Sequence, residues 1–108
     1  MKVSDLVLCE QFEVVTLPDK DREIDGVYVG DLLSWVMGRA QSGNAWITIM
    51  SNVNILAVAS LADTACIILA ESVKLEDSVL ETAKQKGINI LYSEASIYDT
   101  AVWLNQVL

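Results

Sequence analysis

Four acidic side chains between residues 19 and 25 form the densest group of potential metal ligands in the sequence. They are spaced two residues apart, which superficially resembles a calcium-binding loop: Asp19, Asp21, Glu23 and Asp25. A calcium loop of the EF-hand type needs a glycine in its middle and a glutamate at its twelfth position, whereas the glycine here follows the cluster, at Gly26. We therefore predict a solvated, charged loop and no metal site.

The residue types that usually perform catalysis are scarce. Histidine is absent, so proton transfer near neutral pH and the Ser-His or Cys-His nucleophile pairs lack their usual partner. Neither GxxxxGK[ST] nor GxGxxG occurs, so neither type of phosphate-cradling loop is encoded. Cys9 and Cys66 each lie in an apolar stretch, which favours buried, reduced thiols. We expect no catalytic residue, no cofactor and no independent enzyme activity.

The elements that would position any site are short strands that alternate with helical patterns. Strands are predicted at Val27 to Val29, Ala45 to Met50, Ala65 to Ala70 and Ile88 to Tyr92. Helices are predicted from Gly30-Asp31 to Ala40, over Ile55 to Ala62, between Glu76 and Lys86, and after Ser96. Such alternation predicts right-handed crossovers, and hence an α/β fold with a small, mainly parallel sheet flanked by helices on both faces.

The first quarter carries less regular patterns. Ser4-Asp5 could cap a helix that runs through Cys9 to Phe12, and Glu13 to Thr16 is a candidate strand. Leu17 to Asp25 contains Pro18 and six charged residues, which is typical of a solvated loop. The length of 108 residues is enough for one core, so we predict a single domain over residues 1–108.

Polar residues follow three of the predicted strands, where a ligand could bind. In open α/β sheets, ligands bind beyond the carboxyl ends of the strands, and helix N-termini there can meet anions. This rule predicts a crevice lined by Ser51, Asn52, Glu71, Ser72 and Ser93. The alternative is that Ser51, Asn52 and Ser72 only cap helices or make turns.

The helix predicted over Ile55 to Ala62 is apolar on nearly every side, with Ser60 as its only polar residue. A helix that is apolar all round must be buried all round, and a sheet covers only one of its faces. A two-fold partner that presents the same helix would cover the other face. We therefore predict a homodimer interface that includes Ile55, Leu56, Ala57, Ala59 and Ser60. Alternatively, neighbouring loops or the N-terminal quarter fold over this face.

The composition restricts the classes of partner. Hydrophobic residues make up 53% of the chain, more than a small domain hides easily, so some of this surface is expected to meet a partner. The net charge is −8, and the seven Lys and Arg residues are scattered, so we expect neither nucleic acid nor a membrane surface as partner. An early acid argues against a signal peptide and the longest apolar run is short, which predicts a cytoplasmic protein.

Three segments together resemble those of the DRTGG domain family. They are Asp21 to Leu33 (DREIDGVYVGDLL), Ala45 to Ile49 (AWITI) followed by Ala57 to Ala59, and Lys86 to Ser93 (KGINILYS) leading into a final helix. The resemblance implies a three-layer α/β/α sandwich, similar to the N-terminal domain of HPr kinase/phosphorylases but without their separate P-loop kinase domain. Family members occur beside CBS domains in regulated pyrophosphatases and inside some phosphotransacetylases, where they resemble regulatory or dimerising inserts.

The residues that gave this family its name are not kept. The Asp-Arg pair should fall near Asn52-Val53, and the Thr-Gly-Gly near Ala70-Glu71-Ser72. If those residues hold a ligand in other members, this chain has lost or changed it.

Three functions follow from these patterns. The first is a non-catalytic regulatory or dimerisation module that modulates a partner enzyme or complex. The second is a domain that senses a small molecule, for which a nucleotide is plausible. The third is a small independent enzyme, whose reactive groups would all have to be carboxylates and two buried thiols.

Overall fold

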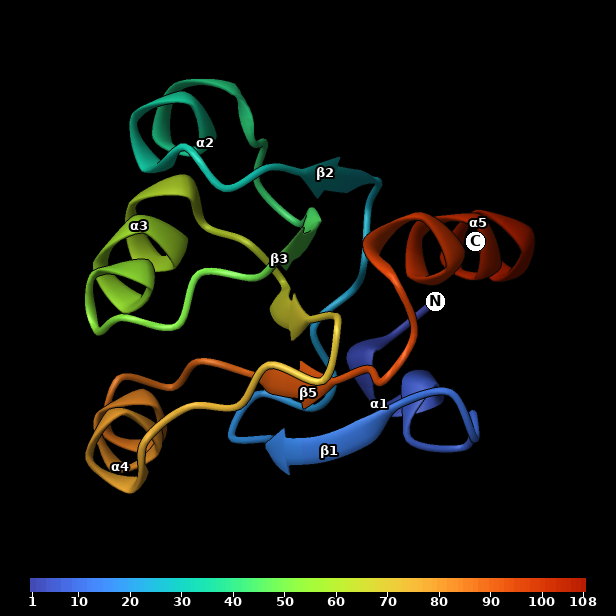
Figure 1. Ribbon diagram of the computed structural model, residues 1–108, viewed down its shortest axis with the longest axis horizontal. Helices are drawn as coiled ribbons and strands as arrows, with labels where there is room; N and C mark the ends of the chain where they lie inside the picture. Colours follow the sequence, from blue (N-terminus) through green and yellow to red (C-terminus); the bar gives the residue numbers. More distant parts are fainter.

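The computed structural model describes residues 1–108 and contains five helices and five strands (Figure 1). The elements run in the order α1 (Val3–Leu6), β1 (Glu13–Thr16), β2 (Val27–Val29), α2 (Leu33–Arg39), β3 (Ala45–Thr48), α3 (Asn54–Ala62), β4 (Cys66–Leu69), α4 (Asp77–Gln85), β5 (Ile90–Tyr92) and α5 (Ile97–Val107). Every predicted strand is present, although most strands are shorter than the apolar runs from which they were predicted.

The strands form one five-stranded sheet in the order β1-β5-β4-β3-β2. Strands β2, β3, β4 and β5 run parallel to one another, and β1 pairs with β5 antiparallel at one edge of the sheet. Strand β4 is fully buried, because it lies in the centre of the sheet with helices on both faces. The predicted α/β fold with a mainly parallel sheet is confirmed.

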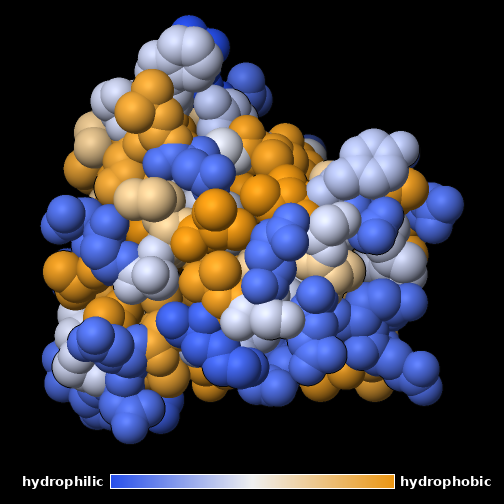
Figure 2. All heavy atoms as spheres, viewed as in Figure 1, coloured by the Kyte–Doolittle hydropathy of each residue, from blue (hydrophilic) through white to orange (hydrophobic).

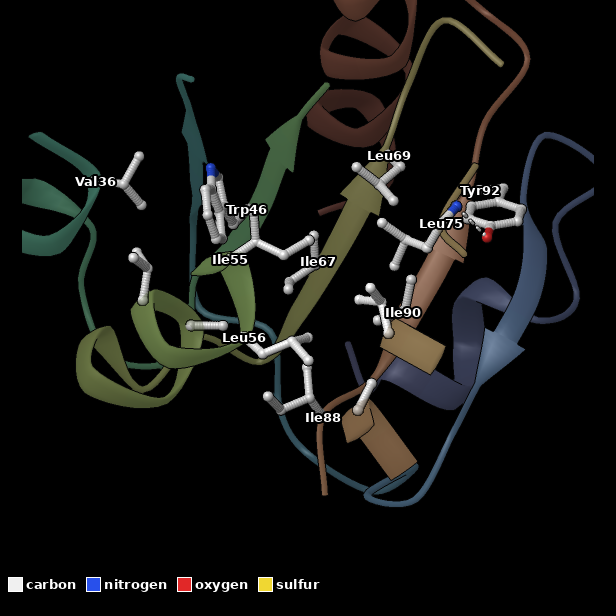
Figure 3. Close-up of a cluster of buried hydrophobic side chains, with 14 residues drawn as sticks. Val36, Trp46, Ile55, Leu56, Ile67, Leu69, Leu75, Ile88, Ile90 and Tyr92 are labelled. Atoms are coloured by element: carbon white, nitrogen blue, oxygen red, sulfur yellow. Dashed lines mark hydrogen bonds between the residues drawn. The ribbon is translucent and has the colours of Figure 1, made fainter. Parts of the chain in front are cut away.

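Helices α2, α3 and α4 cover one face of the sheet, and α1 and α5 cover the other (Figure 1). Alternate residues of each strand point to opposite faces, so each strand contributes to both cores. The first core lies under α2, α3 and α4 and is drawn in Figure 3; it includes Val36, Trp46, Ile55, Ile67 and Val79. The second includes Leu6, Ile47, Ile68, Leu91 and Leu104. The expected three-layer sandwich is therefore present.

Capping residues mark the C-terminal end of α4 and the N-terminal end of α5, whereas α3 has no side-chain cap. Gly87 takes a left-handed φ of 73° after α4. The Ser96 hydroxyl accepts from the Asp99 amide at 3.0 Å and caps α5. Ser51 does not cap α3, whose N-cap is Val53; instead, the Asn52 side chain accepts from the Asn54 amide at 2.9 Å. The Asn52 side chain thus makes a local turn, which is one of the roles expected for it.

The N-terminal quarter differs from its prediction. The helix extends only over Val3–Leu6, and the following residues up to Phe12 form turns that bury Phe12 against Trp103 at a ring distance of 5.1 Å. The loop from Leu17 to Asp25 is anchored rather than freely solvated, because its Asp19 backbone exchanges two hydrogen bonds with the buried Asn89 side chain. No three Asp, Glu or Cys side chains lie close enough together to hold a metal ion.

Helix α3 is covered largely within the protomer, and this corrects part of the predicted interface. Ile55, Leu56 and Ala59 are buried, because α2 packs beside α3 and the sheet lies beneath it. They are therefore not available to a second chain. Ala57 and Ser60 are exposed, and so is the neighbouring Leu61, at 70%. A dimer contact on α3 remains a prediction for this outer face alone.

Both chain ends lie on the α5 side of the molecule (Figure 1). Met1 and Leu108 line one hollow together with Gly26 and Val27, at the end of the sheet where the parallel strands begin. No helix has the combination of length and apolar character that crossing a bilayer requires.

Candidate functional site

The loops that follow β3, β4 and β5 meet at the carboxyl end of the sheet, because these three strands are parallel neighbours. All five predicted ligand residues lie in these loops: Ser51, Asn52, Glu71, Ser72 and Ser93. They do not line one crevice. Ser72 and Ser93 border a hollow beside β5, Ser51 and Asn52 border another beside α4, and Glu71 lines neither.

The hollow beside β5 has a volume of about 360 Å³ and lies between the β4–α4 loop and the segment that leads into β1. Polar side chains dominate it, and its lining includes Glu10, Glu13, Ser72, Lys74 and Glu94. Because β1 runs antiparallel to β5, the start of β1 comes to the same end of the sheet as the end of β5. The segment around Glu10 therefore enters the site from the first quarter of the chain.

Lys74 and Tyr92 form the central pair of this hollow. The Lys74 ammonium lies 4.6 Å from the centre of the Tyr92 ring, a cation–π distance, and it makes no ion pair. The Tyr92 hydroxyl accepts from the Leu75 amide at 2.9 Å, a buried hydrogen bond that fixes the β4–α4 loop on β5 (Figure 3). This bond orients the ring face on which the ammonium rests.

The electrostatics of the hollow oppose a polyphosphate ligand. Three carboxylates face one ammonium in the lining: Glu10, Glu13 and Glu94 against Lys74. Like charges disfavour binding, so an anion with several charges would meet net repulsion there. A neutral or cationic group therefore fits the charge of this lining better.

The β4–α4 loop is strained where it turns past β5. Glu71 and Ser72 both have φ near 61°, a left-handed conformation that side chains disfavour by about 1–2 kcal/mol per residue. The loop is held by two backbone bonds, from the Glu71 amide to the Ala95 oxygen at 2.8 Å and from the Ser72 amide to the Ser93 oxygen at 3.1 Å. The Glu71 carboxylate accepts from the Ile97 amide at 2.8 Å, so it caps the N-terminus of α5 rather than facing a hollow.

The Ser93 side chain makes hydrogen bonds within the fold and offers none to a ligand in the hollow. Its hydroxyl is within 2.9 Å of the Thr100 hydroxyl and accepts from the Ala95 amide at 3.2 Å, and the residue is buried. These bonds tie the end of β5 to the first turns of α5. Ser93 thus borders the hollow, but its polar atoms are already paired.

The second hollow, of about 650 Å³, lies between the start of α3 and the exposed side of α4. Ser51 and Asn52 line it with Glu76, Ser78 and Thr82. It holds one carboxylate and no cation, so it offers hydrogen bonds without a charge that would select an anion.

Sequence reasoning missed Glu10, Glu13, Lys74 and Tyr92. Tyr92 directly precedes the predicted Ser93, and Lys74 is the only basic residue between Arg39 and Lys84, so both had a local signal. Glu10 and Glu13 had none, because their approach depends on the antiparallel pairing of β1 with β5.

Neither thiol is poised to act as a nucleophile. Burial raises the pKa of the Cys66 thiol to about 12, and burial followed by the nearby Asp5 raises the pKa of Cys9. Both therefore stay protonated near neutral pH, where only the thiolate reacts. Neither cysteine lines the hollow beside β5 or the hollow beside α4.

Comparisons with known proteins agree with this architecture. The family model of the DRTGG domain matches residues 5–107. A crystal structure of the CBS and DRTGG domains of the regulatory region of Clostridium perfringens pyrophosphatase, complexed with the activator diadenosine tetraphosphate, has a similar fold, with a TM-score of 0.73 and 13% sequence identity. The match covers 92% of this chain but only 44% of that one, so this chain spans less than half of its length. No curated protein matches the sequence.

Proposed function

This chain belongs to the DRTGG domain family, and on that premise we propose that it is a non-catalytic regulatory module that modulates a partner enzyme or complex. The observation that carries the proposal is the similarity of its fold, over 92% of the chain, to a domain that lies in the regulatory region of a pyrophosphatase. The protonated thiols and the lack of histidine support the non-catalytic part.

The test begins with identification of the partner. Cross-linking of the tagged chain in its native cells, followed by mass spectrometry, names candidate enzymes, and each is then assayed with and without the purified chain. We expect one candidate to change its rate or its response to an effector when the chain is added. If no cross-linked enzyme responds at saturating concentrations, the regulatory proposal fails.

Absence of phosphoryl transfer is the second part of the test. Purified protein is incubated with ATP, magnesium and HPr, and phosphate transfer is followed. We expect none, because no phosphate-cradling loop is encoded. Stoichiometric phosphorylation that persists through a second purification step would contradict the proposal.

The second candidate function is sensing of a small molecule, and the activator in the pyrophosphatase structure makes nucleotides the first compounds to try. Thermal shift and NMR titration with diadenosine tetraphosphate and with adenosine separate two cases. The acidic lining beside β5 predicts that adenosine perturbs Lys74 and Tyr92 more than the polyphosphate does. Stronger perturbation there by the polyphosphate would show that charge does not control this hollow.

A further inference from the structure

Strand β2 forms an open edge of the sheet. It pairs with β3 alone, and flanking bonds from the Ala45 amide to the Gly26 oxygen at 3.0 Å and from the Gly30 amide to the Ile47 oxygen at 3.2 Å set its register. In a parallel ladder alternate residues face the neighbouring strand, so Tyr28 faces β3 and the backbone groups of Val27 and Val29 point outward. No other part of the chain bonds to those outward groups.

The surface beside this edge is apolar. Val29 is 45% exposed and Leu32, at the start of α2, is 57% exposed. A hollow of about 630 Å³ lies between the beginning of β2 and the last turn of α5, and its lining includes Val27 and Val107. Figure 2 shows hydrophobic atoms gathered in the upper and central part of the view, over α2 and the region of β2 and β3.

The charged side chains that flank β2 in the sequence are negative, and the N-terminal ammonium, which lines the hollow at the beginning of β2, is already paired with Glu23 at 3.2 Å. The chain has no Lys or Arg between Arg22 and Arg39, and none in α5. Asp25 precedes β2 and is exposed. Asp31 follows β2 and is half-buried, and one of its carboxylate oxygens accepts from the Thr48 hydroxyl at 2.7 Å and from the Ile49 amide at 3.0 Å. Neither carboxylate has a cationic partner, so an incoming segment would meet backbone donors and acceptors, apolar side chains and two carboxylates without a countercharge.

These features decide between two occupants of the edge. A second copy of this chain, paired antiparallel about Tyr28, would set Asp25 opposite the Asp31 of the other copy at both ends of the ladder. Like charges that face each other across strands are destabilising. A segment that carries Lys or Arg would instead neutralise them.

We propose that the β2 edge binds an extended segment of a partner protein in which apolar residues alternate with Lys or Arg, and that this segment adds a sixth strand to the sheet. Main-chain bonds to Val27 and Val29 supply the pairing, and the apolar surface and the carboxylates select the side chains. The inference rests on the proposed regulatory function and names the surface through which a partner enzyme is held.

The probe is a short capped peptide that alternates valine and lysine, titrated into the isotopically labelled protein. We expect its binding to shift the amide signals of Val27 and Val29 and to slow their hydrogen exchange. Val29→Pro removes an outward N–H without touching the bonds to β3, and proline is tolerated on an edge strand. Its affinity for the peptide is expected to fall about tenfold or more, whereas Val29→Thr, which keeps the N–H, stays within about threefold.

Two peptide controls sharpen the test. N-methylation of alternate peptide residues removes the donors on one side of the strand, so one of the two possible methylation patterns must abolish binding and the other must not. A peptide that alternates valine and glutamate is expected to bind at least about tenfold more weakly than the lysine peptide, with the difference shrinking at high salt.

Several results would overturn the inference. They are equal binding of the acidic and basic peptides, loss of binding with both methylation patterns or with neither, unchanged affinity in Val29→Pro, or a free protein that dimerises through this edge. If Val29→Pro still modulates the partner enzyme as the wild type does, the edge proposal fails and the regulatory function stands. If the wild type modulates no enzyme, the regulatory function fails whatever the peptides do.

Discussion

Ser72→Gly is expected to stabilise the protein, because the β4–α4 loop holds Ser72 at a φ of 61°. A side chain in this left-handed region costs about 1–2 kcal/mol, and glycine avoids that cost. Glycine also gains freedom in the unfolded chain, which offsets about 0.5–1 kcal/mol. The backbone bond from residue 72 to the Ser93 oxygen is kept. The net expectation is about 0.5–1 kcal/mol of added stability, or roughly 2–6 °C in Tm for a chain of this size.

Urea unfolding followed by tryptophan fluorescence, with thermal unfolding by circular dichroism, measures the change. Ser72→Ala is the matched control, since it removes the hydroxyl but keeps a side chain at the same φ, and we expect no gain from it. Glu71→Gly relieves the same strain but loses the bond to the Ile97 amide, which is valued at about 0.5–1.5 kcal/mol. Its net effect is therefore expected to be near zero.

A Ser72→Gly protein that is no more stable than Ser72→Ala would refute the strain argument. So would a gain in Glu71→Gly as large as the gain in Ser72→Gly, because the capping role of Glu71 would then have no energetic weight. If Ser72→Gly is stabilised and partner modulation is lost, the side chain was kept for function in spite of its cost to stability.

Three further predictions concern other parts of the molecule. Tyr92→Phe leaves the Leu75 amide buried without a partner and should lower the free energy of unfolding by about 1–3 kcal/mol in urea; no change would mean that water replaces the bond. Hydrogen bonds from Arg22 and then from the Ser42 hydroxyl lower the pKa of Asp63, so the stabilising contribution of Asp63 is present above its ordinary pKa and is lost as the pH falls below about 4. Asp63→Asn should make the free energy of unfolding fall less steeply with acidification, and an unchanged dependence on pH below about 4 would contradict this. If the chain dimerises through the outer face of α3, Leu61→Arg yields monomers by light scattering, whereas Leu8→Arg, also at an exposed apolar position, does not. If both substitutions have the same effect on the oligomeric state, the dimer interface lies elsewhere.

Local patterns in the sequence identified the central elements well. The predicted strand over Ala65 to Ala70 matches the buried β4, and the helix predicted between Glu76 and Lys86 matches α4 at Asp77–Gln85. These features work because strand burial and helix capping depend on neighbouring residues. The all-apolar α3 was interpreted as an interface, because no local pattern states that α2 packs beside it and buries Ala59.

The predicted ligand residues lie at the carboxyl end of the sheet, but they are divided between two hollows and do not include Lys74 or Tyr92. The rule that ligands bind beyond the carboxyl ends of parallel strands needs only the strand direction, which follows from the alternation of strands and helices. The pairing of Lys74 with Tyr92, and the approach of Glu10, depend on how one loop folds across β5 and on which edge β1 joins. Both are contacts between residues far apart in the chain.

The left-handed pair at Glu71 and Ser72 also gives meaning to the family resemblance. The resemblance places the Gly-Gly of the family's name near these positions, and glycine adopts such a φ without strain. In this chain the left-handed turn brings the β4–α4 loop against the β5–α5 loop.

Both chain ends lie at the same end of the domain. Met1 and Leu108 meet beside the beginning of β2, whereas both carboxyl-end hollows lie at the opposite end of the parallel strands. A longer polypeptide could therefore enter and leave at one end while the other end faces outward. Helix α5 joins the two ends, from the Glu71 cap at Ile97 to Val107, a rise of about 16 Å. Helix α5 therefore links the loop that carries Glu71 directly to the end of the domain at which both chain ends lie.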